Sequence, residues 1–302
     1  MAGFGLLYFG GDWLVGGAAR LALRMKIAPL TVGLTVVAFG TSSPELVVSL
    51  DAALSGLNDI ALGNIVGSNI CNLAFILALA AALRPIAVKA QILRFDIPVL
   101  IASSLLLPGV LWDGVVSRWE AGGLLLGLAA YVAFNVRMGR RESAQVQAEL
   151  APHPAGDRPL RDLLRIALGL AGLTLGAHLF VTGAALLAQR LGVTQAAIGL
   201  TVVALGTSLP ELATSVVAAY RSHGDIALGN VIGSNIFNTL GILGTVSLAE
   251  PVVRGGVTWQ DIGLMAAAGV LLLPLLFSGR RFSRPEGWLA MAGYAAYLIW
   301  RL

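Results

Sequence analysis

The sequence predicts an all-α integral membrane protein with ten transmembrane helices arranged as two inverted five-helix repeats. The composition is the first observation, because 57% of the 302 residues are hydrophobic and 12% are charged, against about 25% charged in soluble domains. The second is an internal repeat: 33–72 matches 199–238 without a gap, with 26 of 40 positions identical. The third is the placement of Lys and Arg at the ends of apolar segments.

Ten apolar stretches approach the roughly 20 residues that cross a hydrocarbon core. We place these helices near 3–23, 29–54, 60–83, 93–112, 117–137, 163–189, 195–219, 226–249, 260–278 and 286–301. Residues 139–161 are polar and contain three prolines. They are expected to form a cytoplasmic linker between a first repeat, 1–138, and a second repeat, 162–302.

The distribution of basic residues gives the orientation. An odd number of helices per half turns the second copy upside down, which is the plan of many secondary transporters. Alternating loops then assign 16 of the 20 Lys and Arg residues to one side. The other side receives Arg118, Arg190, Arg254 and Arg301. Because cytoplasmic loops carry the excess of basic residues, we expect both termini to lie outside the cytoplasm.

Each repeat contains a motif that interrupts a helix, GTSSPE at 40–45 and GTSLPE at 206–211. Proline lacks an N–H and its ring displaces the carbonyl four residues earlier. Carbonyls just before the break, such as those of Ala38 and Ala204, are therefore expected to be released. At membrane depth, released polar groups are tolerated only inside protein or beside a wet cavity. A bound cation would be a suitable partner for them.

Each of these motifs also sets one acidic residue inside an otherwise apolar segment, Glu45 and Glu211. An ionisable residue inside a membrane segment is by default a hypothesis for a functional site. Neighbouring hydroxyls add neutral oxygens, namely those of Thr41, Ser42, Thr207 and Ser208. A hard cation such as Ca²⁺ takes about six to eight oxygen ligands of these kinds. The set therefore favours a cation site.

The second half of each copy, GNIVGSNICN at 63–72 and GNVIGSNIFN at 229–238, adds further polar groups. Ser68 and Asn72 are four residues apart and share one helical face, as do Ser234 and Asn238. Small residues allow close helix approach, and we assign this role to Gly63, Gly67, Gly229 and Gly233. We expect broken second, third, seventh and eighth helices around one midplane site.

These paired motifs resemble the α-repeats of the cation/calcium antiporter superfamily, and the chain is similar to prokaryotic sodium/calcium exchangers over nearly its whole length. The resemblance implies a secondary antiporter of the prokaryotic inner membrane, exchanging Na⁺ for Ca²⁺ by alternating access. It implies no enzyme activity and no cofactor. The expected partners are Ca²⁺ and Na⁺ ions and the lipid bilayer; we see no sign of a protein or nucleic-acid partner.

The resemblance also implies a ligand set. The central Ca²⁺ site would use Glu45, Glu211, Thr41 and Thr207. Flanking Na⁺ sites would add the Ala38 carbonyl and Ser68 on the cytoplasmic side, and the Ala204 carbonyl and Ser234 on the outer side. Ser42, Ser208, Asn72 and Asn238 would line the same cavity. Potassium-dependent relatives carry Asp in place of Asn238, so this chain resembles the potassium-independent branch.

Other readings stay open. A Ca²⁺/H⁺ antiporter could use the same scaffold, with the two glutamates cycling protons; dependence of Ca²⁺ flux on a Na⁺ gradient separates the two. A channel would conduct without a counter-ion. An intramembrane enzyme fits poorly, because no nucleophile–base pair or His-rich metal site falls in the helices.

Four further residues receive structural interpretations. Asp12 is expected to have a structural or gating role in the first helix. Asp59 and Asp225 precede helices and are interpreted as N-caps. Cys71, the single cysteine, is expected to contribute packing.

Overall fold

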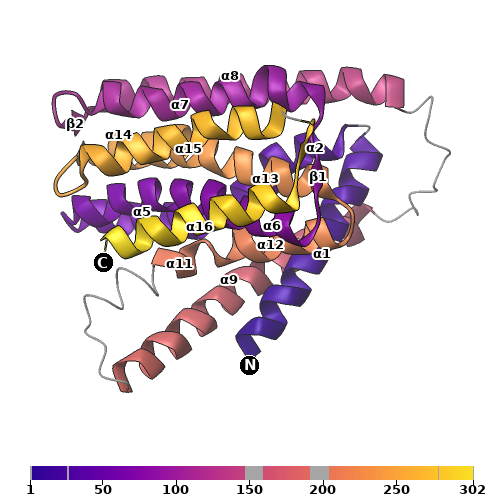
Figure 1. Ribbon diagram of the computed structural model, residues 1–302, viewed down its shortest axis with the longest axis horizontal. Helices are drawn as coiled ribbons and strands as arrows, with labels where there is room; N and C mark the ends of the chain where they lie inside the picture. Colours follow the sequence, from indigo (N-terminus) through magenta and orange to yellow (C-terminus); the bar gives the residue numbers. More distant parts are fainter. Residues whose placement is uncertain (1, 26, 147–158, 191–203, 278, 302) are drawn as a thin grey trace.

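The computed structural model describes residues 2–25, 27–146, 159–190, 204–277 and 279–301. Most helices run along the long axis of an elongated bundle, whereas α1 (Ala2–Met25) and α9 (Pro159–Arg190) run obliquely to it (Figure 1). The prediction of an all-α membrane fold is confirmed in its class: six helices in the described residues are long and apolar enough to span a membrane. A bent pair, Pro29–Thr41 with Ser43–Leu54, makes a seventh.

The first half contains a series of interrupted helices after α1. Its elements are α2 (Pro29–Val32), the π-helical turn η1 (Gly33–Val37), α3 (Ala38–Thr41), α4 (Ser43–Leu54), α5 (Asn58–Cys71), η2 (Asn72–Ile76), α6 (Leu77–Leu83), η3 (Ile92–Asp96), α7 (Ile97–Val110) and α8 (Arg118–Val146). Helix α8 continues beyond the expected end at 137 into the segment predicted as linker. The rest of that segment up to 158 lies outside the described residues.

The second half repeats this series after α9. Its elements are α11 (Ala204–Thr207), α12 (Leu209–Tyr220), α13 (Gly224–Ile236), η5 (Phe237–Ile242), α14 (Leu243–Ala249), α15 (Trp259–Phe277) and α16 (Arg284–Arg301). The expected beginning of the seventh helix, 195–203, lies outside the described residues. So do the first five positions of the second 40-residue copy, 199–203.

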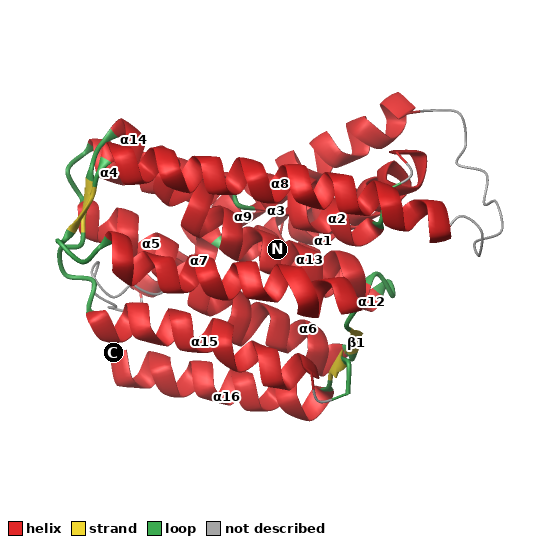
Figure 2. Cartoon of the chain, turned by 90° about the horizontal axis from the view of Figure 1, so that it is seen from above, coloured by secondary structure: helices red, strands yellow, loops and turns green. Residues whose placement is uncertain are grey.

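Two short antiparallel ladders join connections of the two halves, and the sequence did not predict them. Strand β1 (Ile86–Ala87) pairs with β4 (Arg281–Phe282), and β2 (Val115–Val116) pairs with β3 (Val252–Val253). The ladders lie at opposite ends of the long axis (Figures 1 and 2). A strand of two residues is too short to show the alternation of apolar and polar residues that predicts a strand from sequence. These ladders become visible only when the tertiary structure brings the connections together.

Helices α1 and α9 contact each other through glycines. A methyl group placed on Gly169 would lie 2.8 Å from the carbonyl oxygen of Gly10, and one on Gly176 would lie 3.0 Å from that of Gly3. At one end of this contact, Asp162 of α9 accepts from Nε of Arg20 and Arg24 at 2.7 Å each. The two helices therefore form one closely packed pair.

Three aspartates make contacts between elements. Asp12 forms an ion pair with Arg221 at the end of α12, in line with a structural role. The N-cap interpretation of Asp59 and Asp225 is wrong, because α5 and α13 begin one residue earlier in each case. Asp59 instead accepts from the N–H of Gly256 at 2.8 Å, and Asp225 pairs with Lys89 at 2.7 Å. Both carboxylates thus reach the other half of the chain.

Candidate cation site

The two GTSxPE motifs break their helices at equivalent serines. Ser42 has φ −85° and ψ 6°, and Ser208 has φ −88° and ψ 6°. In the first copy the flanking helical segments are bent by 43°. The proline of each motif lies in the first turn of the following helix, where its missing N–H leaves no intrahelical bond unmade. The predicted interruption of these helices is therefore present in the structure.

Glu45 and Glu211 lie in the first turn of the helices after the breaks and are both buried, with exposures of 1% and 0%. The hydroxyl of Ser42 donates to Oε1 of Glu211 at 2.7 Å. The hydroxyl of Ser208 donates to Oε1 of Glu45 at 3.3 Å. Each carboxylate is thus held by the serine of the other copy, which places the two motifs against each other.

The second carboxylate oxygen, Oε2, has no hydrogen-bond partner among the described residues in either glutamate. Buried polar atoms are nearly always hydrogen-bonded, and an exception calls for an explanation. An ionised carboxylate can only accept, so a hydroxyl beside it or a cation would satisfy these atoms. The two carboxylates also repel each other electrostatically. The donor set and its charge therefore fit a cation.

The serines and asparagines of the second motif half line the same region. The Ser68 hydroxyl of α5 lies within hydrogen-bond distance of the Ser208 hydroxyl, at 3.3 Å, and Ser234 of α13 donates to Glu211 Oε1 at 3.5 Å. The amide of Asn238 donates to Asn69, and its own Oδ1 has no partner in the described chain. Both amide atoms of Asn72 are likewise unpartnered among the described residues. These side chains are all buried.

In the first copy, the carbonyls that were expected to be released are hydrogen-bonded instead. The carbonyl oxygen of Ala38 accepts from the Ser42 N–H at 3.0 Å and from the Thr41 hydroxyl at 3.3 Å. That of Phe39 accepts from the Ser43 hydroxyl at 2.9 Å. Hydroxyl side chains commonly re-satisfy the backbone at breaks in membrane helices, which explains the difference. Ala204, the equivalent of Ala38, opens α11.

Two asparagines that the sequence interpretation did not single out connect the copies. Thr41 donates to Oδ1 of Asn230 at 3.0 Å, and Thr207 donates to Oδ1 of Asn64 at 3.2 Å. The identity of Asn64 and Asn230 at matching repeat positions is the signal that could have found them. All four members of these contacts are side chains of the repeated motifs.

Close approach of the motif helices is confirmed where both partners are described. A methyl group on Gly233 would lie 2.6 Å from the carbonyl oxygen of Leu34, and one on Gly229 would lie 2.9 Å from that of Leu30. The repeat equivalents of these two partners, positions 196 and 200, would face Gly63 and Gly67, and they lie outside the described residues. Cys71 is buried in the apolar core, as expected.

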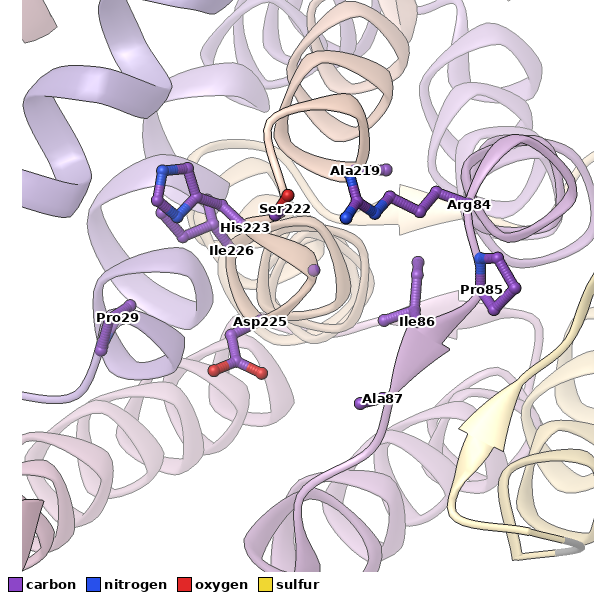
Figure 3. Close-up of a pocket in the computed structure, with 11 residues that line it drawn as sticks. Pro29, Arg84, Pro85, Ile86, Ala87, Ala219, Ser222, His223, Asp225 and Ile226 are labelled. Atoms are coloured by element: carbon purple, nitrogen blue, oxygen red, sulfur yellow. The ribbon is translucent and has the colours of Figure 1, made fainter.

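A separate cavity of about 270 Å³ lies at one end of the bundle, between the connections that follow α6 and α12. Figure 3 shows Arg84 extending toward Ala219 and Ser222. Partial burial, with repulsion from Arg221, lowers the pKa of His223, which lines it. Its one carboxylate, Asp225, is paired with Lys89. This cavity therefore lacks the paired carboxylates that distinguish the candidate cation site.

The apolar helices and the buried cluster of carboxylate, hydroxyl and amide oxygens are typical of a membrane protein that binds cations. A family model described as sodium/calcium exchanger protein matches residues 1–137 and 162–302. The chain therefore belongs to the sodium/calcium exchanger family.

Individual relatives cover the chain from end to end. The inner membrane protein YrbG of Escherichia coli is 33% identical, over 99% of this chain and 94% of that protein. The sodium/calcium exchanger MaX1 of Methanosarcina acetivorans is 32% identical, over 99% of this chain and 96% of that protein. A structure of the sodium-calcium exchanger NCX_Mj, soaked with Na⁺ and Ca²⁺, superimposes with a TM-score of 0.86 at 33% identity, covering 99% of this chain and 95% of that one.

Proposed function

We propose that this protein exchanges Na⁺ for Ca²⁺ by alternating access, independently of K⁺ and without a cofactor. The observation that carries the proposal is the buried pair Glu45 and Glu211, each bridged by the other copy's serine and each with one unpartnered oxygen in the described chain. In this proposal the two glutamates, Thr41 and Thr207 bind Ca²⁺. The flanking Na⁺ ligands are the Ala38 and Ala204 carbonyls, Ser68 and Ser234, with Ser42, Ser208, Asn72 and Asn238 lining the cavity.

Charge balance supplies the coupling. The two ionised glutamates carry a charge of −2, which one Ca²⁺ or two Na⁺ neutralise. Moving an uncompensated charge through a buried membrane site is costly. The protein therefore reorients when it is filled by either ion and resists reorienting when it is empty. This preference couples the two fluxes into an exchange.

The strand pairing supports an inverted arrangement of ten helices. Strand β1 has its repeat equivalent in β3, and β2 has its equivalent in β4, at the same spacing of 166 residues as the motifs. Two repeats in the same orientation would bring equivalent connections to the same side. Instead β1 pairs with β4, and β2 pairs with β3, at opposite ends of the bundle. We propose five helices in 1–138, a cytoplasmic linker at 139–161 and five inverted helices in 162–302.

The α1–α9 pair is the proposed moving element. Its glycine contacts bring the two helices close together, and the Asp162 ion pairs also hold them to each other. Sliding of this pair across the core would open the site to alternate sides. Following the distribution of Lys and Arg, we propose that the protein lies in the prokaryotic inner membrane with both termini outside the cytoplasm.

A Ca²⁺/H⁺ antiporter is the second candidate. Oε2 of each glutamate has no hydrogen-bond partner among the described residues, so it can take up a proton. Radiolabelled Ca²⁺ uptake into proteoliposomes separates the two. Three kinds of vesicles are compared at matched osmolarity: vesicles loaded with Na⁺, vesicles loaded with K⁺, and Na⁺-free vesicles with a pH gradient across the membrane. Uptake only from Na⁺-loaded vesicles is expected. Uptake driven by the pH gradient alone would replace Na⁺ with H⁺, and uptake without any counter-ion would identify a channel.

A further inference from the structure

Three hydrogen bonds in a row connect the Asn238 side chain to the backbone of its own repeat by way of the other repeat. The Asn238 amide nitrogen donates to Oδ1 of Asn69 in α5 at 3.0 Å. The Asn69 amide nitrogen donates to the Thr239 hydroxyl at 2.9 Å. That hydroxyl donates to the carbonyl oxygen of Asn235 at 3.1 Å. Each of the four residues is 1% exposed, so these bonds form away from bulk water.

The acceptors at the far end of this series fix the direction of every bond in it. A backbone carbonyl can only accept, so the Thr239 hydrogen is committed to Asn235 and the hydroxyl oxygen accepts from Asn69. The Asn69 amide nitrogen also lies 3.4 Å from the thioether sulfur of Met265 in α15, which is likewise an acceptor. This edge of the Asn69 amide is therefore NH₂, and the opposite edge, which meets Asn238, is the oxygen.

Asn238 consequently keeps its own oxygen for another partner. It donates its NH₂ group to Asn69, and its Oδ1 has no partner in the described chain. Ser234, four residues earlier on the same helical face, donates to Oε1 of Glu211, so Asn238 lies one turn from the carboxylate pair. Amide oxygens bind hard cations, whereas an NH₂ group carries hydrogens that repel them. The hydrogen bonds therefore present Asn238 in the form that a cation requires.

The first copy has no such series of hydrogen bonds. Leu73 occupies the repeat position of Thr239, and a leucine side chain neither donates nor accepts. Asn235, at the repeat position of the α5 asparagine, donates instead to the carbonyl oxygen of Val231 in its own helix at 2.8 Å. Asn72 has both amide atoms unpartnered among the described residues. The replacement of leucine by threonine thus accompanies the fixed amide of the second copy.

We infer that Asn69 and Thr239 are positioning residues, which hold the Asn238 amide with its oxygen available to the transported cation. They act through Asn238 and not as ligands themselves. The inference rests on the proposed function, in which Asn238 lines the cation cavity. It makes the two repeats unequal, because the Asn238 amide is oriented before the ion arrives and the Asn72 amide is oriented by the ion.

The size of the effect follows from what a freed Asn238 amide would do. In an empty site the negative carboxylates attract an NH₂ group and repel an amide oxygen. Without the series of hydrogen bonds, the turned form would therefore be favoured by about the strength of one hydrogen bond. The cation then binds only the minor form, and its apparent affinity falls in proportion to that fraction. The half-saturating cation concentration should rise about threefold to tenfold.

Uptake of radiolabelled Na⁺ and Ca²⁺ into proteoliposomes tests this role in a double-mutant cycle. Asn238→Ala removes the oxygen and identifies which cation it binds. For that cation, Thr239→Val should raise the half-saturating concentration about threefold to tenfold and change the maximal rate less than about twofold. The double variant should lie within about twofold of Asn238→Ala, because nothing is left to orient. Thr239→Ser keeps the hydroxyl and should restore the wild-type affinity.

Two control variants match the groups that are removed. Thr35 also donates to the carbonyl oxygen four residues earlier, that of Thr31, at 2.6 Å, and no side chain among the described residues bonds to it. Thr35→Val should therefore leave the affinity unchanged. Asn235→Ala removes an equally buried asparagine whose amide donates within its own helix, and it should also have no effect. Thermal melting in detergent checks that each variant is folded.

An unchanged affinity in Asn238→Ala or in Thr239→Val would overturn the inference, as would effects of these two substitutions that multiply. A lower maximal rate at wild-type affinity in Thr239→Val would show a packing role and would overturn it too. If Thr239→Val does not fold, Asn69→Ala with Asn238→Ala provides the same cycle. Wild-type protein without Na⁺-driven Ca²⁺ uptake would instead refute the proposed function, so the two failures are distinguishable.

Discussion

Replacing Glu211 by glutamine removes one charge from the site with little change in shape. Glu211 is fully buried and accepts from Ser42 at 2.7 Å and from Ser234 at 3.5 Å. A glutamine oxygen can accept from both serines, so the hydrogen bonds at Oε1 survive. The site charge falls from −2 to −1. With Ca²⁺ bound the variant therefore carries +1 where the wild-type site is neutral.

The size of the effect follows from this uncompensated charge. A single charge at the centre of a membrane helix costs about 3 kcal/mol on insertion scales. If the transition state for reorientation carries that cost, exchange of Ca²⁺ slows about 100-fold, since each 1.36 kcal/mol is a factor of about ten. One Na⁺ neutralises the remaining glutamate, so Na⁺/Na⁺ exchange should be reduced much less.

Both fluxes are measured in the same proteoliposomes with radiolabelled Ca²⁺ and radiolabelled Na⁺. Glu211→Asp is the matched control, because it keeps the charge and shortens the side chain. It should bind Ca²⁺ more weakly and still reorient. Wild-type Ca²⁺ exchange in Glu211→Gln would refute the charge-balance reasoning. Equal slowing of both fluxes in the Asp and Gln variants would show that side-chain shape, and not charge, controls reorientation.

Three further substitutions test the packing. Gly169→Ala should destabilise the protein and lower its Tm in detergent, because the new methyl would lie 2.8 Å from the Gly10 carbonyl oxygen; Gly122→Ala, whose methyl would meet nothing within 4 Å, is the control. Gly233→Ala should destabilise the protein by about 1–3 kcal/mol, measured as a lower Tm in detergent. Asp162→Asn weakens two ion pairs of a buried carboxylate. It should lower the free energy of unfolding by about 1.5–3 kcal/mol, which is again measured as a lower Tm.

Each of these expectations has a contrary result. A wild-type Tm in Gly169→Ala would show that α1 and α9 are not in close contact at this glycine. A Gly233→Ala variant with wild-type Tm would mean that the helices of the motif are not in close contact. If Asp162→Asn melts at the wild-type temperature, the ion pairs contribute nothing to holding α1 against α9.

The sequence alone was sufficient for the membrane class and the repeat, and it predicted that the two motifs would lie together. Each of these depends on local chemistry: apolar length for the spans, and Gly and Pro for the breaks. The glutamates could be found because an acidic residue in an apolar segment needs a partner. Identity at matching positions then indicated that Glu45 and Glu211 work together. The structure places their motifs in contact as expected.

Only the tertiary structure decided how the two copies are connected. That Ser42 bonds Glu211, and that Asn230 bonds Thr41, depends on which side chains the tertiary packing brings within about 3 Å of each other. The same holds for Asp59, whose partner Gly256 lies far along the chain. Residue type and helical spacing specify which groups are available and which face they share. The choice of partner is made between elements distant in sequence, by a packing that no local pattern encodes.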